Sequence, residues 1–387
     1  MGSILAINGG SSSVKFAIFD TETLERRLGG RIERVGTRAA ALVAGGEKRT
    51  LDASNHEAAV RALFDWLSAR SALRDIAAVG HRVVHGGVEL NSHARVTPEL
   101  LGKLDDARPF DPAHLPFEIA MIQAASRALP GVPQIACFDT AFFRDLPRVA
   151  QSLPIPRTYL DRGIRRLGFH GLSYAYLIEA LRHAAGDFAA DGRVLLAHLG
   201  SGASLAALSG GCPVDTTMAF TPAAGLVMAT RPGDLDPGLV VYLMRAERLS
   251  PEAMDAFVNE RCGLKGVSGT TGDMRELLAL RAEDPRAAEA VALFVYQAAK
   301  GIGAFAAALG GLDTLVFSGG IGEGSPVVRE EICARLGFLG LSLDRSSNEA
   351  GAAVISDSGS RVSVRVIPTD EEIVMARIVR DILRKER

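Results

Sequence analysis

The chain has 387 residues, too many for one ordinary hydrophobic core, and this length predicts two domains. Its 43 Lys and Arg and 45 Asp and Glu give a net charge of -2, which excludes a general electrostatic attraction to nucleic acid. The hydrophobic content of 48% is that of a globular protein. We find no run of 18 apolar residues free of charge, so we expect no membrane partner.

Cysteine use and the first residues predict the compartment. The four cysteines lie far apart and form no C-x-x-C pair; they are Cys137, Cys212, Cys262 and Cys333. Reduced thiols are the simplest interpretation of this spacing. No signal peptide precedes the first apolar run, so we expect a cytoplasmic protein.

Strands and helices alternate in the first half. We predict paired strands over Ile4–Gly9 and Val14–Asp20, joined by more small residues than a hairpin turn requires. Helical periodicity covers Asn55–Ser71, with an apolar face at Ala59, Leu63, Trp66 and Leu67. The following pattern predicts, in order, a strand over Ile76–Val84, a helix over Pro116–Leu129, a strand over Gln134–Phe138 and a helix over Gly171–Ala185.

The second half repeats the opening pattern. A strand over Val194–His198 begins "VLLAHLGSGASLAALSGG", whose Gly200-Ser201 aligns with Gly10-Ser11 at an offset of 190 residues. We interpret the two Gly/Ser tips as the mark of a duplicated domain.

The C-terminal third predicts further strand and helix pairs. "DTLVFSGGIGEGSPVVREEI" predicts a strand, a Gly-rich turn and a helix with Pro326 near its start. Thr369 or Asp370 would cap the final helix, with Glu371 and Glu372 in its first turn. This interleaving predicts an α/β fold with helix-covered sheets.

The opening loop is a candidate phosphate site. Small residues let backbone N–H groups approach an anion, Lys15 adds a positive charge, and Asn8 adds an oxygen that can reach a metal. A flexible Gly/Ser turn is the alternative. The P-loop motif is absent, and Gly200-x-Gly202 lacks the third glycine of the dinucleotide fingerprint. "GGIGEG" at 319–324 would suit the close approach of a nucleotide.

Four side chains stand at predicted strand ends or in loops. Arg82 ends a strand in "GHRVVHGG" and needs an anionic partner, either a ligand or a structural carboxylate. Asp139 follows the next strand, His170 precedes a helix in "LGFHGLSY", and Arg231 lies in "MATRPGDLDPG". Each has a purely structural alternative. Together with the Gly-rich segments they favour phosphoryl transfer, where a protein positions reactants and neutralises negative charge.

Ten blocks in this order resemble the acetate kinase family, from Ile4 to about Arg380: "INGGSSSVKF", "GHRVVHGG", "FDTAFF", "GFHG", "AHLGSGAS", "DTTMAFTP", "ATRPGDLDPG", "VSGTTGD", "GGIGEG" and "IPTDEE". The resemblance implies an α/β fold of two duplicated ribonuclease H-like domains with a cleft between them, as in sugar kinases and actin. One domain would be 1–142 plus 373–387, completed by the C-terminal helix. The other, 143–372, would bind nucleotide and form the dimer.

The resemblance also implies a reaction. It is reversible, direct in-line phosphoryl transfer between ATP and acetate, giving ADP and acetyl phosphate, with Mg²⁺ or Mn²⁺, in a homodimer. Propionate or another short-chain acid is an alternative substrate on the same scaffold. A catalytically inactive sensor of acetyl phosphate or nucleotide is the alternative outside enzymes.

Site roles follow from the resemblance residue by residue. Asn8 and Glu371 match the metal positions; Asp139, His170 and Arg231 match the catalytic ones. The substrate positions are Arg82, Val84, Ala113, Phe169 and Pro222. The ATP positions are Lys15, His198, Leu199, Gly200, Ser201, Gly202, Asp273, Met274, Arg275, Gly320, Ile321, Gly322, Glu323 and Gly324. A carboxylate is already nucleophilic at neutral pH, so we expect Asp139 to orient a neighbour or a metal rather than to act as a base.

The sequence departs from the family pattern at several positions. Ser201 replaces an Asn, "HLPFE" keeps His114 but loses two Asn, one of them at Leu115, and the usual residues at Phe143 and Ala224 are His and Glu. Ala113 stands where Leu is common. We hypothesise that this smaller side chain admits one more methylene, so that propionate is accepted better than in the family at large.

Overall fold

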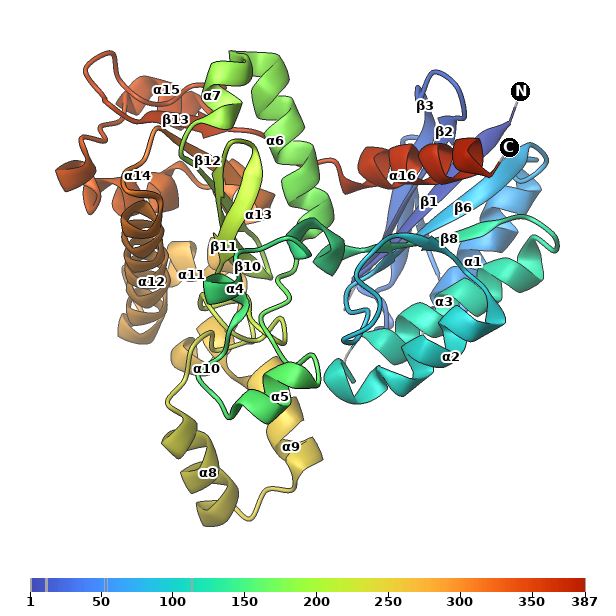
Figure 1. Ribbon diagram of the computed structural model, residues 1–387, viewed down its shortest axis with the longest axis horizontal. Helices are drawn as coiled ribbons and strands as arrows, with labels where there is room; N and C mark the ends of the chain where they lie inside the picture. The colour runs from blue at the N-terminus through green and yellow to red at the C-terminus, as the bar shows by residue number, and fades with distance from the viewer. Residues whose placement is uncertain (1, 11–12, 52, 54, 113, 387) are drawn as a thin grey trace. The chain divides into compact units, whose positions relative to one another are not determined.

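The computed structural model describes residues 2–10, 13–51, 53, 55–112 and 114–386, which form two compact units, each with its own sheet (Figure 1). Unit 1 comprises residues 1–144 and 370–387, and unit 2 comprises residues 145–369. The chain passes from one unit to the other after Arg144 and again after Thr369. These boundaries lie within three residues of the predicted domains 1–142 plus 373–387 and 143–372.

Unit 1 contains an eight-stranded sheet of order β5-β4-β3-β2-β1-β6-β8-β7. Its strands are β1 (Ser3–Gly9), β2 (Ser13–Asp20), β3 (Arg26–Glu33), β4 (Ala41–Ala44), β5 (Glu47–Thr50), β6 (Ile76–Val83), β7 (Ala94–Arg95) and β8 (Gln134–Phe138). Its helices are α1 (His56–Ala69), α2 (Pro98–Asp106), η1 (Arg108–Phe110), α3 (Leu115–Ala128), η2 (Asp139–Phe143) and α16 (Glu371–Lys385).

The two faces of this sheet pack against different helices. Leu5, Ile7 and Phe16 pack with Trp66 of α1 and Met121 of α3 in one apolar core, because alternate residues of a strand share a face. Helix α16 lies against β1 and β6 (Figure 1).

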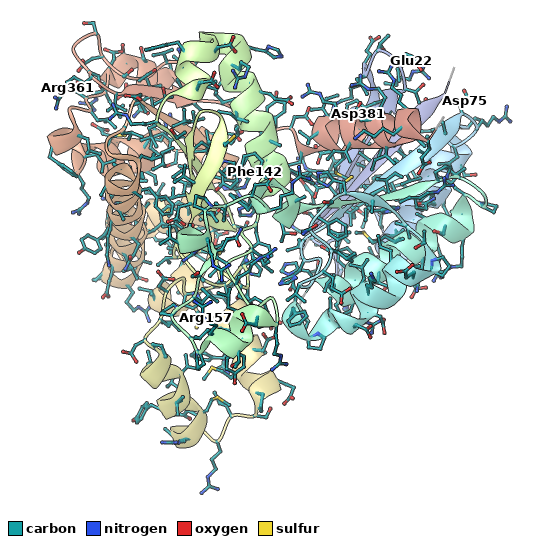
Figure 2. The ribbon with its side chains drawn as sticks, viewed as in Figure 1. Glu22, Asp75, Phe142, Arg157, Arg361 and Asp381 are labelled. Carbon is teal, nitrogen blue, oxygen red and sulfur yellow. The ribbon has the colours of Figure 1, made fainter. Side chains whose placement is uncertain are left out.

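Helix α16 approaches the sheet closely. A Cβ atom on Gly80 of β6 would lie 2.9 Å from Val379 Cγ2 of α16, so glycine is what permits this approach. The outer face of α16 carries exposed charges such as Asp381 (Figure 2). An apolar face toward the sheet and a charged face outward explain why this segment is a helix here.

Unit 2 contains a five-stranded sheet of order β11-β10-β9-β12-β13. Its strands are β9 (Val194–Leu199), β10 (Ala203–Ser209), β11 (Cys212–Thr216), β12 (Thr314–Ser318) and β13 (Ser363–Val366). Its helices are α4 (Arg148–Gln151), α5 (Arg157–Asp161), α6 (Gly171–Ala185), α7 (Asp187–Asp191), α8 (Pro237–Ala246), α9 (Pro251–Ala256), the π-helix η3 (Phe257–Arg261), α10 (Gly263–Ser268), α11 (Met274–Leu280), α12 (Pro285–Leu309), α13 (Gly319–Gly324), α14 (Pro326–Ala334), η4 (Gly337–Leu339) and α15 (Arg345–Ala350).

Five strands of each unit share one topology. β1 pairs antiparallel with β2 and parallel with β6, and β9 pairs antiparallel with β10 and parallel with β12. The third strand, β3 or β11, extends the antiparallel side, and the fifth, β8 or β13, extends the parallel side. The duplication predicted from the two Gly/Ser tips is therefore confirmed.

The helices that follow these repeats are exchanged. Helix α6 follows β8 of unit 1 in the chain but packs on β9 of unit 2. Helix α16 follows β13 of unit 2 in the chain but packs on the sheet of unit 1.

The predicted strands and helices are all present, with ends that differ by at most two residues. The Gly-rich turn predicted at 319–324 is wrong, because this segment forms helix α13. At its start, Glu323 accepts hydrogen bonds from the Gly319 N–H at 2.8 Å and from Ser318 Oγ at 3.2 Å. At its end, the buried guanidinium of Arg329 donates to the carbonyls of Gly322 and Glu323. These contacts offset the low helix propensity of four glycines.

Helix α12 is, among the described residues, the one helix long and apolar enough to cross a bilayer by length and composition. Half of its most apolar window is buried inside the protein, as in a core helix. Its buried face, which includes Ala298, Ile302 and Ala306, packs on β9, β10 and β11.

Candidate active site

Arg82 and Asp139 form the centre of a charged cluster in unit 1. They meet because β6 and β8 are parallel neighbours and both residues stand at the same end of the sheet. Arg82 Nη2 donates to Asp139 Oδ2 at 2.6 Å, and Arg82 Nε lies 3.2 Å from both oxygens of this carboxylate. Asp139 is fully buried, so the anionic partner predicted for Arg82 is present within the protein.

The N-terminus of α16 adds two carboxylates to this cluster. Asn8, on β1, donates through Nδ2 to Glu371 at 2.8 Å and to Glu372 at 2.9 Å, and its Oδ1 accepts from Arg82 Nη1 at 3.2 Å. Arg82 Nη1 lies 3.8 Å from Glu371. Asp370 caps α16, as predicted, and this cap fixes the first helical turn that presents both glutamates.

Charge decides the protonation of this cluster. Burial alone disfavours the guanidinium, but the carboxylates of Asp139 and Glu371 outweigh it and raise the pKa of Arg82. Burial and the charge of Glu371 raise the pKa of Glu372, whereas Lys15 and Asn8 act in the opposite direction. Unit 1 therefore holds a permanent cation beside three carboxylates.

The same residues fit a divalent metal. Glu371 offers carboxylate oxygens, which Mg²⁺ accepts as ligands. Asn8 faces the glutamates with Nδ2, so its amide would have to rotate to offer its oxygen to the same ion. Glu371 and Glu372 share one amide, and a cation there would relieve their mutual repulsion. In the described part of the chain no three His, Cys, Asp or Glu gather as a metal cage. A metal at this position would therefore take its other ligands from water and phosphate, as is common for Mg²⁺.

Lys15 stands beside this cluster on β2. It pairs with Asn8 in the β1–β2 register, and its side chain is exposed. Its charge acts against the rise in the pKa of Glu372 that burial and Glu371 cause. The candidate residues Ser11, of the opening loop, and Ala113, of the acyl pocket, lie outside the described residues.

Glu118 and Asp111 are two buried acids that sequence reasoning did not single out. Both carboxylate oxygens of Glu118 lie 3.1 Å from the backbone nitrogen of Val84, an expected substrate residue. Asp111 Oδ1 pairs with His114 Nδ1 at 2.8 Å, and its Oδ2 is buried without a hydrogen-bond partner among the described residues. Burial and the charge of Asp111 raise the pKa of Glu118 well above its usual range. The sequence offered one signal for Glu118, because "HLPFE" ends with this acid.

A second cluster lies in unit 2 around His170. His170 is the N-cap of α6 and has a φ of 60°, a left-handed conformation that is uncommon outside glycine. Its ring stacks on that of His198, with centroids 4.3 Å apart. Helix α6 and strand β9 thus place two imidazoles face to face.

Arg231 converges on the same place. A Cβ atom on Gly202 would lie 2.9 Å from Arg231 Nη2 and 3.2 Å from His170 Nε2, so both nitrogens approach the backbone of the β9–β10 tip. Arg231 Nη1 donates to the carbonyl of Pro222 at 2.7 Å. His170, Arg231, Gly202 and Pro222 were separate candidates, and the fold brings them together.

The nucleotide candidates form two groups. Leu199 and Gly200 adjoin α13, because a Cβ on Gly319 would lie 2.7 Å from the Leu199 carbonyl and one on Gly200 would lie 3.7 Å from the Gly320 nitrogen. His198 Nδ1 lies 2.8 Å from Ser173 Oγ, which contacts Thr369 Oγ1 at 2.9 Å. The first group therefore contains 198–202 and 320–324.

The second group is the start of α11. Asp273 caps this helix and pairs with Arg275, whose side chain is 90% exposed. Met274 is buried in the core. The segment adjoins the Arg231 loop, because a Cβ on Gly272 would lie 2.5 Å from the carbonyl of Ala229.

The unusual positions have structural surroundings. Leu115 is buried in the apolar core of α2 and α3, and Phe143 is buried edge-on to Phe142. Phe169 is also buried. Ser201 is exposed, and its carbonyl accepts from the Ala229 N–H at 3.0 Å. Nothing in the structure explains Ala224.

Comparisons with known proteins identify the family. The acetokinase family profile matches residues 3–377. An acetate kinase of Rhodopseudomonas palustris is 43% identical over 97% of both chains, and a propionate kinase of Citrobacter rodentium is 41% identical over 97% of this chain and 96% of its own. Among solved structures, a Porphyromonas gingivalis acetate kinase is 36% identical with a TM-score of 0.86, covering 99% of this chain and 100% of its own. A Francisella tularensis propionate kinase is 33% identical with a TM-score of 0.90, covering 98% and 99%.

The duplicated topology and the two clusters, together with these matches, define a phosphotransferase with two ribonuclease H-like units. The chain belongs to the acetokinase family.

Proposed function

We propose that this protein catalyses reversible, direct transfer of a phosphoryl group between ATP and acetate. The observation that carries the proposal is the pairing of Arg82 with buried Asp139 at the end of β6, within a chain of the acetokinase family. A guanidinium held by one carboxylate keeps free N–H groups for another, and its forked geometry matches a substrate carboxylate. Asp139 then orients Arg82 and is not a base, because acetate is already ionised at neutral pH.

In unit 2, His170 and Arg231 would stabilise the transferring phosphoryl group. Their Nε2 and Nη2 atoms approach the same glycine, so two donors converge beside the backbone of the β9–β10 tip. Charge spreads over the equatorial oxygens in the transition state, and preorganised donors aimed at it lower the barrier. The 198–202 and 320–324 segments, with Lys15 of unit 1 and 273–275, would hold the nucleotide.

Asn8 and Glu371 would hold Mg²⁺, with Mn²⁺ as a substitute. The bound metal would neutralise charge on the phosphates of the nucleotide. The contacts of Asn8 with Glu371 and Arg82 support this role, because they place the metal candidates beside the substrate candidate.

A hydroxamate assay of the purified protein with ATP and Mg²⁺ tests the proposal. We expect acyl hydroxamate from acetate and none from Arg82→Ala. The exposed Arg61→Ala variant, whose guanidinium pairs on the surface with Glu57 of α1, should match wild type. Nucleotide binding without any acyl phosphate would instead support the sensor alternative.

Propionate is the second candidate substrate, favoured by the similarity to two propionate kinases. Replacing Ala113 by Leu should lower kcat/KM for propionate relative to acetate by about 10-fold, since one methylene is worth about 1–3 kcal/mol of discrimination. If the ratio of kcat/KM for propionate to kcat/KM for acetate is unchanged, Ala113 does not determine the choice between these two substrates.

We further propose a cytoplasmic homodimer. Helix α8 supports this, because none of its residues is buried and it exposes Leu239, Val241 and Tyr242. An exposed apolar helix of this kind suits a protein interface. Light scattering should give twice the 40.9 kDa chain mass, and Tyr242→Glu should shift the protein toward monomer.

A further inference from the structure

His170 is joined to two buried hydroxyl groups that none of the roles above uses. Ser204 Oγ, on β10, lies 2.8 Å from His170 Nδ1, and Tyr174 Oη, on α6, lies 2.6 Å from the same Ser204 oxygen. Ser204 and Tyr174 are both fully buried. The three side chains therefore form a chain of hydrogen bonds from the unit 2 core to the imidazole.

The chemistry of the two hydroxyls indicates which group donates and which accepts in each of these hydrogen bonds. A phenol is a stronger donor and a weaker acceptor than an aliphatic alcohol, so Tyr174 donates to Ser204. Among the described residues, the other side-chain contact of the Ser204 hydroxyl is Nδ1 of His170. With its one hydrogen directed there, Ser204 donates and Nδ1 accepts. A neutral imidazole that accepts at Nδ1 carries its hydrogen on Nε2.

The Nε2 atom is the one that faces the proposed reaction. It approaches Gly202 from the same side as Arg231 Nη2. A hydrogen on Nε2 can be donated to an anionic oxygen at that place, whereas a bare nitrogen there would repel it.

We infer that Tyr174 and Ser204 are positioning residues that fix His170 as the Nε2–H tautomer and hold its ring toward Gly202. The inference rests on the proposed role of His170 in phosphoryl transfer. The left-handed backbone of His170 gives a reason for such a restraint, because a residue other than glycine keeps this conformation where surrounding contacts hold it.

A second serine of the protein provides a matched control. Ser173, also fully buried, makes the same kind of contact with the stacked neighbour, His198 Nδ1, at 2.8 Å. Ser173→Ala should therefore perturb His198, whereas Ser204→Ala should perturb His170. The two serines differ in which imidazole they contact.

Long-range ¹H–¹⁵N correlation spectra of the full-length protein without substrates test the inference directly. Loss of one imidazole signal in His170→Gln would assign this residue among the eight histidines. We expect Nε2–H in wild type, a shift toward the other tautomer or a mixture in Ser204→Ala and Tyr174→Phe, and an unchanged His170 tautomer in Ser173→Ala. An Nδ1–H tautomer in wild type, or unaltered His170 signals in both variants, would overturn the inference.

Kinetics give the second measurement. Tyr174→Phe should lower kcat by about 3- to 10-fold with little change in KM for ATP, and Ser204→Thr, which keeps a hydroxyl, should restore most of the rate lost in Ser204→Ala. Should Ser204→Ala fail to fold, the Tyr174→Phe spectrum decides alone. The spectra need no turnover, so a protein that is inactive with every carboxylate would refute the proposed function and leave the tautomer result standing.

Discussion

The two units share a strand order and differ in what they place at equivalent strand ends. In unit 1 the ends of β6 and β8 carry Arg82 and buried Asp139, and the first turn of α16 adds two glutamates. In unit 2 the corresponding region carries glycines, serines and two stacked histidines, with Arg231 arriving from a loop. One topology thus supports a charge-dense cluster in one copy and a cluster of mostly neutral donors in the other.

Because of this difference, substitutions in the two clusters should affect folding stability and catalysis to different degrees. A buried ion cluster is costly to break, because removing one member leaves the others uncompensated. Hydrogen-bonding groups around a glycine tip can lose a member with less effect on folding, although they are suited to a developing negative charge. We therefore expect substitutions in unit 1 to affect folding and activity together, and substitutions in unit 2 to affect mainly activity.

Replacing Arg82 by Ala should give the largest effect. Asp139 would stay buried without its cation, so the free energy of unfolding should fall by about 3–5 kcal/mol, together with the activity. The single tryptophan, Trp66, lies in the unit 1 core, so its fluorescence during urea unfolding reports on this unit. Arg61→Ala, at an exposed pair, should cost less than about 0.5 kcal/mol. Equal losses in the two variants would contradict the contrast between the units.

Replacing Arg231 by Ala should lower kcat by about 10²–10³-fold, the usual effect of losing one preorganised donor. Because Arg231 belongs to unit 2, the Trp66 unfolding transition should stay in place. Steady-state kinetics and the same urea titration measure both quantities on one preparation. A rise in KM for ATP at constant kcat would show that Arg231 contributes to ground-state binding of the nucleotide and not to stabilisation of the transition state.

Acidification should destabilise unit 1 through His81. Burial lowers the pKa of His81 to about 4 from 6.5, so the folded state keeps this residue neutral where the unfolded chain binds a proton. The contribution of neutral His81 to the free energy of unfolding is therefore fully present above about pH 6.5. It is lost as the pH falls toward 4, and the loss is about 2 kcal/mol at pH 5. His81→Gln should flatten this dependence in Trp66 unfolding at pH 7 and 5. The exposed His183→Gln should leave it unchanged, and an equal slope in both variants would count against His81.

Glu118→Gln should have the opposite pH dependence and the smallest effect. The raised pKa of Glu118 means that the folded state binds the extra proton, so this residue favours folding at low pH and loses that contribution as the pH rises through its folded pKa. The Gln variant should therefore gain stability relative to wild type as the pH rises. The Val84 N–H and Arg82 oppose the burial effect without cancelling it. The effect should still be the smallest of the four, because the glutamine oxygen can accept from the Val84 N–H in place of the carboxylate. A difference independent of pH would show that the carboxyl does not titrate.

Much of the fold was predictable because its signals are local. The apolar face at Ala59, Leu63 and Trp66 marked helix α1, and alternation marked the paired strands at the N-terminus. The segment 319–324 was predicted wrongly, since its helix depends on Arg329, a residue that follows it in the chain and is placed by packing. Propensity alone cannot register such a contact.

The sequence predicted where several site residues lie, but not which other side chains they contact. Arg82 and Asp139 stood out because charged residues stand at the ends of apolar strands. Glu118 did not, since a carboxylate inside a helix is ordinary until its burial is known. Tyr174 and Ser204 look like core residues, and only their distances to His170 reveal a polar chain.

The sequence by itself determined the predicted strands and helices apart from 319–324, and the Gly/Ser tips, because backbone preference and hydrophobic periodicity act over a few neighbouring residues. The tertiary structure decided which side chains meet: Asn8 with Glu371 across 363 positions, and Arg82 with Asp139 across 57. Such contacts depend on strand order and on the exchange of the final helix between repeats, which no local pattern encodes. The charges and protonation states of the candidate site follow from these long-range contacts.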